Sequence, residues 1–300
     1  MSKQRTIAKP FTLSGRGLHT GLELTARFCP ADEDTGYRIC RVDLDARPII
    51  PATAEYVVNT RLGSVYGIGD VRCSTVEHAM SAFFAMGIDN LLIEVNGPEI
   101  PILDGSAEPY MRCINDVGIV EQTADKHIIA PGEIVKVETE NGSSIKILPA
   151  DDFRLTVTID FGGRFLGMQT ATLNNIRDFE EEICRARTFV YVRDIEPLLA
   201  AGLIKGGNLD NAIVIYETPT TQERIDMLCK LTGVEHHDAS AMGYIQHKPL
   251  VWENEPARHK LLDLIGDLAQ VGAEIHGHVI ATKPGHTVNN KFARKLIASS

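Results

Sequence analysis

The sequence predicts an α+β fold made of two similar domains. The first observation is that each half of the 300-residue chain passes through several strand-like segments and then continues as helix, strand, helix. The second is that in each half a helix with an early histidine ends at a glycine, Gly87 or Gly272, and leads into an apolar strand. A polar stretch at 121–127 separates the two series. We therefore expect a first domain at 1–124 and a second at 125–300.

The first half is predicted to contain several strands and two helices. Residues 74–87 predict a helix, because Ser74 or Thr75 can cap its start and Gly87 can end it. The apolar and β-branched residues of the remaining segments favour strands, with a glycine-rich turn inside the first of them. The strand segments are 6–31, 37–44, 50–58 and 90–97, and the second helix is 107–118.

The second half repeats this order. The Asn141-Gly142 pair predicts a hairpin between two strands, since this dipeptide favours the tight turn that joins antiparallel neighbours. Strands are expected at 133–139, 144–150, 154–161, 211–216 and 276–282. Helices are expected at 177–187, 195–204, 258–272 and 286–299.

Composition and charge exclude several classes of protein. The formal net charge is −10 and no block of Lys or Arg forms a basic stripe, which argues against a nucleic-acid partner. The six cysteines are scattered and form no Cys-x-x-Cys pair, so we expect free thiols in a reducing compartment. The start of the chain has no apolar signal region, and no run of about 18 apolar residues occurs. We expect a cytoplasmic protein without an integral membrane segment.

One predicted helix carries polar residues along the edge of its apolar face. His259 and Asp263 are one helical turn apart, and Asp267 follows one turn later. The first two can reach a common cation, with ligand atoms about 2.0–2.2 Å from it. Spacing alone favours the alternative of an i,i+4 His–Asp pair on a solvated face. Asp267 would be placed to orient another charged group.

Two further motifs complete a candidate zinc site. Neighbours on a helix point about 100° apart, so His78 can bind a metal while Glu77 reaches a water beside it. With the helix at 258–272 this gives three protein ligands and a general base, the pattern of catalytic zinc. His286 follows a glycine turn and suits a general acid or an oxyanion stabiliser. Taken singly, these residues fit a capping glutamate and surface histidines.

Six motifs occur in order along nearly the whole chain. They are SGRGLHTG (14–21), the segment 74–110, RARTFVYVRDIE (185–196), GLIKGGNLDNAIV (202–214), RHKLLDLIGDL (258–268) and GHTVNNK (285–291). Together they resemble the zinc-dependent UDP-3-O-acyl-N-acetylglucosamine deacetylases. The resemblance implies a hydrolase that removes acetate from a UDP-sugar lipid, the committed step toward lipid A in Gram-negative bacteria. It also implies that the helices pack between the two sheets.

The resemblance assigns a role to each matched residue. The zinc ligands match His78, His259 and Asp263. The base matches Glu77, the acid or oxyanion partner His286, and its neighbouring carboxylate Asp267, while Thr188 matches a hydroxyl that helps to hold the oxyanion. Positions that bind the sugar and the acyl chain match Leu18, Thr60, Phe189, Tyr191, Ile195, Ile204, Asn208, Leu209, Ala212 and Lys260.

One segment departs from the family pattern. Residues 217–256 are longer than usual for the family, and KPLVWENEPARHK (248–260) is similar to a subgroup fused to a 3-hydroxyacyl-carrier-protein dehydratase. Two alternatives are open: a stand-alone deacetylase, or a longer protein in which a C-terminal dehydratase domain, absent from these 300 residues, is a partner. The role of 217–256 is open at this stage, as are the oligomeric state and the preferred acyl length.

Two other functions fit the same residues. A zinc amidohydrolase that acts on another acylated amide would use the same site, and nucleotide-sugar binding would discriminate the two. A non-catalytic protein with a structural zinc would need a fourth ligand, and no cysteine is placed to supply one. Fe²⁺ would accept the same two histidines and one carboxylate as Zn²⁺. Either Glu77 or His286 could protonate the leaving amine.

Overall fold

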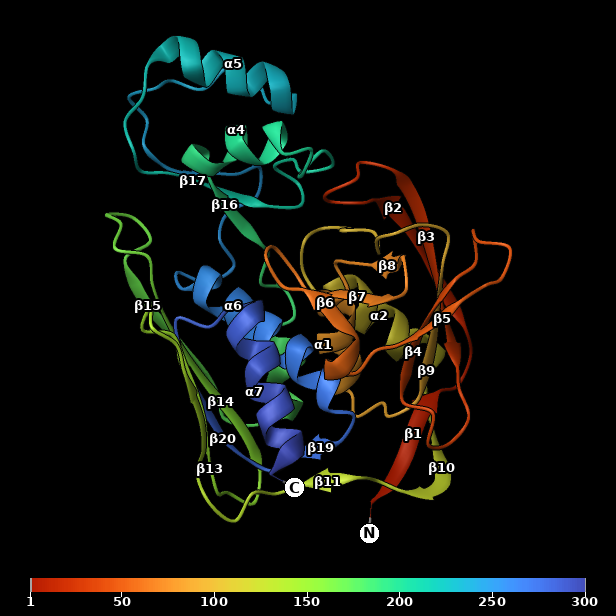
Figure 1. Ribbon diagram of the computed structural model, residues 1–300. Coiled ribbons are helices and arrows are strands. Elements are labelled where there is room, and N and C mark those ends of the chain that lie inside the picture. The colour runs from red at the N-terminus through yellow and green to blue at the C-terminus, as the bar shows by residue number, and fades with distance from the viewer. Residues whose placement is uncertain (1, 300) are drawn as a thin grey trace.

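The architecture is two five-stranded sheets with helices between them (Figure 1). The computed structural model describes residues 2–299. The four helices of the central layer are α1 (Glu77–Ala85), α2 (Glu108–Val117), α6 (Glu255–Leu268) and α7 (His286–Ala298). This arrangement confirms the predicted α+β class, with the helices packed between the sheets.

The two sheets have the same topology. The first has the order β2-β3-β9-β4-β5, and the second has the order β12-β13-β20-β14-β15. In each sheet the last strand in sequence is inserted at the centre and makes the single parallel pairing, β4 with β9 and β14 with β20. The strands of the first sheet are β2 (Phe11–Arg16), β3 (Glu23–Pro30), β4 (Tyr37–Arg41), β5 (Ile49–Pro51) and β9 (Leu91–Val95). Those of the second are β12 (Val135–Glu138), β13 (Ser144–Leu148), β14 (Phe153–Asp160), β15 (Met168–Leu173) and β20 (Gly277–Thr282).

Two short strand pairs lie where the halves join. The antiparallel pair joins β1 (Lys3–Ile7) to β10 (Ile119–Asp125). The parallel pair joins β11 (Ile128–Ile129) to β19 (Glu274–Ile275), beside the 3₁₀ turn η3 (Ala269–Val271). The chain therefore passes from the first half to the second between β10 and β11, and the boundary at 124/125 stays a prediction.

Each half carries an insert between its fourth sheet strand and its first long helix. The insert of the first half has the 3₁₀ turn η1 (Ala54–Tyr56) and the strands β6 (Val57–Asn59), β7 (Val65–Ile68) and β8 (Val71–Cys73). In the second half, η2 (Ile176–Asp178) and α3 (Phe179–Glu182) precede the insert. That insert has β16 (Phe189–Tyr191), α4 (Val192–Ala200), β17 (Ile213–Tyr216), α5 (Gln222–Thr232) and β18 (Gly243–Ile245), and it projects at the top of Figure 1.

Three local predictions were wrong. The start of α1 has no side-chain cap, because Thr75 has a left-handed φ of 58° and its hydroxyl donates to Glu99 instead. The helix expected at 177–187 is only the four residues of α3 after a 3₁₀ turn. The strand expected at 50–58 is interrupted by η1.

The apolar faces of both sheets and of the central helices form one continuous core. Phe28 of the first sheet, Phe83 of α1 and Phe292 of α7 are fully buried in it. The three-residue step from β20 into α7 places His286 at the first position of that helix. Among residues 2–299, no helix has the length and apolar character needed to cross a lipid bilayer.

Candidate metal centre

The candidate metal ligands come from two helices that pack against each other between the sheets. α1 provides His78 and α6 provides His259 and Asp263. The helices approach closely at Gly266, where a Cβ atom would overlap the backbone carbonyl oxygen of Glu77. All three ligand side chains are buried.

The spacing of these three side chains fits one metal ion. Their candidate ligand atoms all lie within 4.8 Å of one another. Asp263 Oδ1 is 3.4 Å from His259 Nε2 and 3.7 Å from His78 Nε2. Ligand atoms about 2.0–2.2 Å from a tetrahedral ion are roughly 3.4 Å apart, so the site needs little rearrangement to accept one.

The hydrogen bonding of His259 leaves the correct nitrogen free for a metal. Its Nδ1 lies 2.9 Å from the carbonyl oxygen of Ala186, which can only accept, so Nδ1 carries the proton. Nε2 then presents a lone pair toward Asp263. Burial, together with the neighbouring His259, lowers the pKa of His78 to about 3, which keeps that ring neutral as a ligand must be.

The third candidate ligand is held as a carboxylate. Burial opposes the charge of Asp263, but His259 and Lys260 together lower the pKa of this carboxyl well below its ordinary value. Lys260 Nζ donates to Asp263 Oδ2 at 2.6 Å. The other oxygen, Oδ1, faces the two histidines.

Glu77 has a carboxylate oxygen without a partner. The side chain is only 5% exposed, and its Oε2 has no hydrogen bond among the described residues. Burial raises the pKa of Glu77 to about 7; the nearby His286 opposes this rise, and Asp263 and Asp267 add to it. A buried carboxylate with this pKa can exchange a proton near neutral pH.

His286 is held against Asp267 behind the ligands. Its Nδ1 donates to Asp267 Oδ2 at 2.8 Å, and its Nε2 lies 4.0 Å from Asp263 Oδ2. Burial lowers the pKa of His286, but Asp267 outweighs it and raises that pKa to about 9. His286 is therefore a cation at neutral pH, with Nε2–H directed toward the ligand cluster.

Asp267 accepts more hydrogen bonds than the sequence predicted. Besides His286, its oxygens accept from Asn289 Nδ2, Gln270 Nε2 and the hydroxyl of Ser64. Asn289 lies three residues after His286 on α7, a spacing that could have indicated a shared target. Ser64 comes from the insert of the first half, and nothing in its local sequence pointed to this site.

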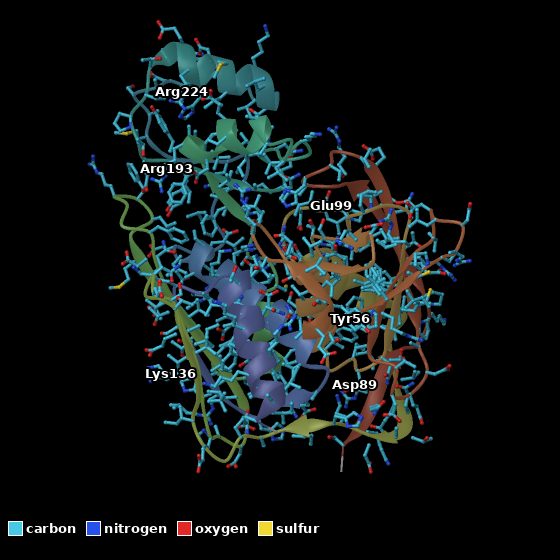
Figure 2. All side chains as sticks on the ribbon, viewed as in Figure 1. Tyr56, Asp89, Glu99, Lys136, Arg193 and Arg224 are labelled. Atoms are coloured by element: carbon cyan, nitrogen blue, oxygen red, sulfur yellow. The ribbon has the colours of Figure 1, made fainter. Side chains whose placement is uncertain are left out.

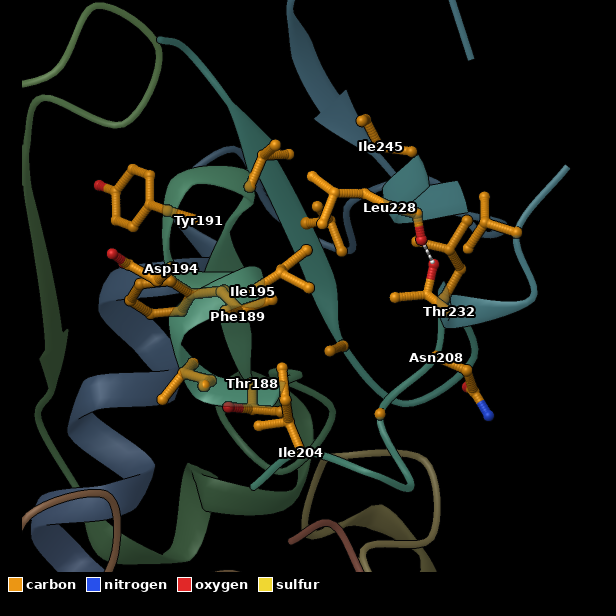
Figure 3. A pocket seen from close by; sticks show the side chains of 18 of the residues that line it. Thr188, Phe189, Tyr191, Asp194, Ile195, Ile204, Asn208, Leu228, Thr232 and Ile245 are labelled. Atoms are coloured by element: carbon orange, nitrogen blue, oxygen red, sulfur yellow. Dashed lines mark hydrogen bonds between the residues drawn. The ribbon is translucent and has the colours of Figure 1, made fainter. Parts of the chain in front are cut away.

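Two cavities meet at the candidate metal centre. A polar cavity of about 580 Å³ contains the three ligands, Glu77, His286 and the predicted Thr60. An apolar cavity of about 460 Å³ extends into the insert of the second half, where Ile195, Leu228 and Ile245 surround one space (Figure 3). Residues that line both cavities are Leu18, Leu62, Phe161, Thr188, Phe189 and Lys260.

The structure brings the predicted substrate residues together at these cavities. Those that line the apolar cavity are Leu18, Thr188, Phe189, Tyr191, Ile195, Ile204, Asn208, Leu209, Ala212 and Lys260. The sequence did not identify the contribution of α5, whose Ile225, Leu228 and Thr232 close the cavity on one side. It also missed Phe161, which lies 5.6 Å from Phe189 between ring centroids.

Comparison with known proteins gives a consistent result. The profile of the family "LpxC: UDP-3-O-acyl N-acetylglycosamine deacetylase" matches residues 4–228 and 234–298. The chain is 54% identical to the bifunctional enzyme LpxC/FabZ of Bacteroides thetaiotaomicron and 52% identical to that of Porphyromonas gingivalis, over 99% of the chain in both cases. It spans 64% of the length of these two relatives.

A relative with a shorter chain matches over most of its length. The UDP-3-O-acyl-N-acetylglucosamine deacetylase of Myxococcus xanthus is 40% identical over 98% of this chain and 86% of its own. The predicted similarity to the fused subgroup is confirmed by the two bifunctional relatives. The chain thus belongs to the LpxC family of UDP-3-O-acyl N-acetylglycosamine deacetylases.

Proposed function

We propose that this chain is a zinc-dependent deacetylase that hydrolyses the acetamide of UDP-3-O-acyl-N-acetylglucosamine to the free amine and acetate. The observation that carries the proposal is a buried ligand set beside a carboxylate with one unpartnered oxygen. The set lies where a polar and an apolar cavity meet, as a substrate with a nucleotide-sugar part and an acyl chain requires. Membership of the LpxC family supports the same reaction.

His78, His259 and Asp263 would hold the metal ion. Three protein ligands with an open fourth position are typical of catalytic rather than structural zinc. When bound, the ion would polarise a carbonyl oxygen and make a neighbouring water more acidic. Two imidazoles and one carboxylate would accept Fe²⁺ as well, so zinc is the proposed ion and metal analysis tests it.

Glu77 would act as the general base. Its free Oε2 can accept a proton from the attacking water, and burial has moved its pKa to about 7, close to the pH at which the group must work. The water oxygen then forms a bond to the acetamide carbon, and the C–N bond breaks in the following step. The departing nitrogen takes one proton, from Glu77 or from His286.

His286 and Thr188 would stabilise the negative oxygen that forms during the attack. The Nδ1–H of His286 is held by Asp267, so Nε2–H is the donor available to substrate. Thr188 lines both cavities, and its backbone is fixed by bonds to Gly105 and Ile213. Removal of one such preorganised donor typically costs a factor of about 10²–10³ in kcat.

The two cavities would divide the substrate between them. The apolar cavity, lined by Ile195, Leu209 and Ala212, suits the fatty-acyl chain. Lys260 borders both cavities and supplies a positive charge at their junction. Thr60, on the polar side, hydrogen bonds to Thr287 of α7 at 2.8 Å and would lie beside the sugar.

The proposal also assigns the reaction to a biosynthetic pathway and the enzyme to a cellular compartment. The reaction would be the committed step of lipid A biosynthesis in a cytoplasmic enzyme. The dehydratase domain that the sequence resemblance implies would be its covalent partner in a longer chain, in line with the bifunctional LpxC/FabZ relatives.

The test is deacetylation of UDP-3-O-acyl-N-acetylglucosamine by the purified chain. We expect turnover that is lost on chelation and restored by zinc, with one zinc bound per chain. A folded, zinc-loaded chain without turnover would overturn the proposal and leave a different acylated amide as the substrate.

A further inference from the structure

A buried ion pair lies one helical turn before the candidate ligand His259, and the proposed reaction gives it no role. The side chain of Arg187 is 7% exposed and that of Glu255 is 0% exposed. The two groups bind in a bidentate manner, with Nε 2.9 Å from Oε1 and Nη2 3.1 Å from Oε2. Such a pair adds little net stability by itself, because the free energy lost on removing two charges from water is about as large as the free energy gained from their attraction.

The hydrogen bonds of the pair extend to three segments of the chain. Arg187 also donates to the carbonyl oxygens of Lys248 and Pro249. Glu255 accepts from the backbone N–H groups of Arg187 and Val251. The pair therefore ties the first turn of α6 to residues 186–188 and to the end of the second-half insert.

Each partner lies next to a residue of the site. Arg187 stands between Ala186, whose carbonyl oxygen accepts from His259 Nδ1, and Thr188, which lines both cavities. Glu255 is one helical turn before His259 on α6. The pair thus fixes the distance from the Ala186 carbonyl to the helix that carries the ring it orients.

We propose that Arg187 and Glu255 are positioning residues that hold the His259 ring in its metal-binding orientation and Thr188 at the cavity wall. The first part concerns metal binding alone, and the second rests on the proposed function. Mutation of a group that orients a metal-binding histidine typically lowers metal affinity about 10–100-fold. Here the orienting acceptor is a backbone carbonyl, so the ion pair would act by holding that backbone in place.

The principal test is Glu255→Gln in the full chain. A glutamine oxygen can still accept from Arg187, but its NH₂ group would face the N–H of Val251 or the guanidinium, which are donors as well. We expect zinc affinity, measured by competition with a chromophoric chelator, to fall about 10–100-fold. We also expect kcat to fall while KM stays within about twofold, since Thr188 alone is displaced and the other residues that line the cavities stay in place.

Arg187→Lys is the milder second variant. Lysine keeps the positive charge beside Glu255 but cannot also donate to Lys248 and Pro249 in the planar arrangement of a guanidinium. We expect a smaller loss of zinc affinity than in Glu255→Gln, and this variant decides the matter if the glutamine variant does not fold. The matched control is Arg224→Met, which removes the exposed pair with Glu196 on the projecting insert (Figure 2) and should change neither affinity nor kcat.

A purely structural pair would give a different pattern. In that case the melting temperature of both variants would fall while the zinc affinity and kcat of the folded protein stayed at wild-type values, and the inference would be overturned. Failure of the proposed function would give a different result from failure of this inference. The wild-type protein would then have no deacetylase activity, but the zinc affinities of wild type and variants could still be compared by competition.

Discussion

The two halves of the molecule have the same sheet order but different inserts at the same point of the repeat. In the first half, the insert between β5 and α1 is a small three-stranded sheet, β6-β7-β8. In the second half, the insert between β15 and α6 is also a three-stranded sheet, β16-β17-β18, with α4 and α5 added. The small insert brings polar groups such as Ser64 to the buried carboxylate Asp267, whereas the large one encloses the apolar cavity.

Under the proposed function, this difference would let one framework present two surfaces to one substrate. The helices α1 and α6, each of which follows the insert of its half, carry the candidate metal ligands and the proposed base, so these residues lie in the repeated framework and not in the inserts. The inserts differ in what they add around that centre. Chemistry should therefore depend on the helices, and selectivity for the acyl chain on the large insert.

The largest losses of bound zinc and of activity are expected for substitutions on α6 and α1, and the two helices should differ in which property is lost. His259→Ala removes a metal ligand, so we expect loss of both bound zinc and turnover. Glu77→Ala should keep zinc and lose about 10²–10⁴-fold in kcat, because only the general base is missing. Zinc content by atomic absorption and kcat on the same preparations test this. Full activity of Glu77→Ala would rule out the proposed base.

A smaller effect is expected for His286 on α7. His286→Gln removes the cationic donor held by Asp267, and kcat should fall about 10²–10³-fold while zinc content is unchanged. The control is His278→Gln on β20, a half-buried position where the ring hydrogen bonds to Thr156 and touches none of the candidate site residues in the part of the chain that the structure describes. Equal activity of the His286 variant and this control would contradict the assignment.

The large insert should control chain length rather than chemistry. Ala212→Phe places a ring in the apolar cavity, and kcat/KM for a long-acyl substrate should fall about 10–100-fold, equivalent to about 1–3 kcal/mol. A short-acyl analogue should be affected far less. Met227→Trp, at an exposed position of α5, is the control. An equal loss on both substrates would mean that the acyl chain lies elsewhere.

The smallest functional effect is expected at the junction of the halves, where the change should appear in stability alone. Lys126 Nζ lies 2.9 Å from Asp89 and 3.6 Å from Glu274, and donates to the carbonyl of Gly87. Lys126→Met should lower the free energy of unfolding by about 1–3 kcal/mol, because Asp89, whose side chain is 18% exposed, loses its cationic partner. Lys136→Met, in an exposed pair with Glu138, should cost well under about 1 kcal/mol. Urea denaturation compares the two, and Asp89 and Lys136 are marked in Figure 2.

Helical spacing placed some of the candidate site residues together, whereas the family resemblance was needed to assign His78, His259 and Asp263 as one ligand set. His259, Asp263 and Asp267 are one turn apart, so any helix places them on one side, and Glu77 with His78 begins a second helix. The predicted orienting role of a carboxylate at 267 agrees with its bond to His286. What periodicity cannot give is which distant segment packs beside these helices, and for this reason Ser64 and Phe161 were missed.

The local errors have a common physical cause. Thr75 looked like a helix cap, but its hydroxyl is used by Glu99, a fully buried carboxylate that also accepts from His19 and Thr20. The helix expected at 177–187 ends at Glu182, and further along the chain the backbone N–H of Arg187 donates to the buried Glu255. In both places a long-range buried group overrides the local preference, which a sequence pattern does not contain.

The close approach of α6 to α1 at Gly266 has a consequence for the choice of ion. Because the two backbones touch there, the spacing between the imidazole of His78 and the carboxylate of Asp263 is set by rigid helices and not by adaptable loops. A ligand cage of fixed size cannot expand to six or more oxygen donors, as calcium demands. The smallest residue in the helix would thus contribute to the selectivity of the proposed site among ions, although it offers no ligand of its own.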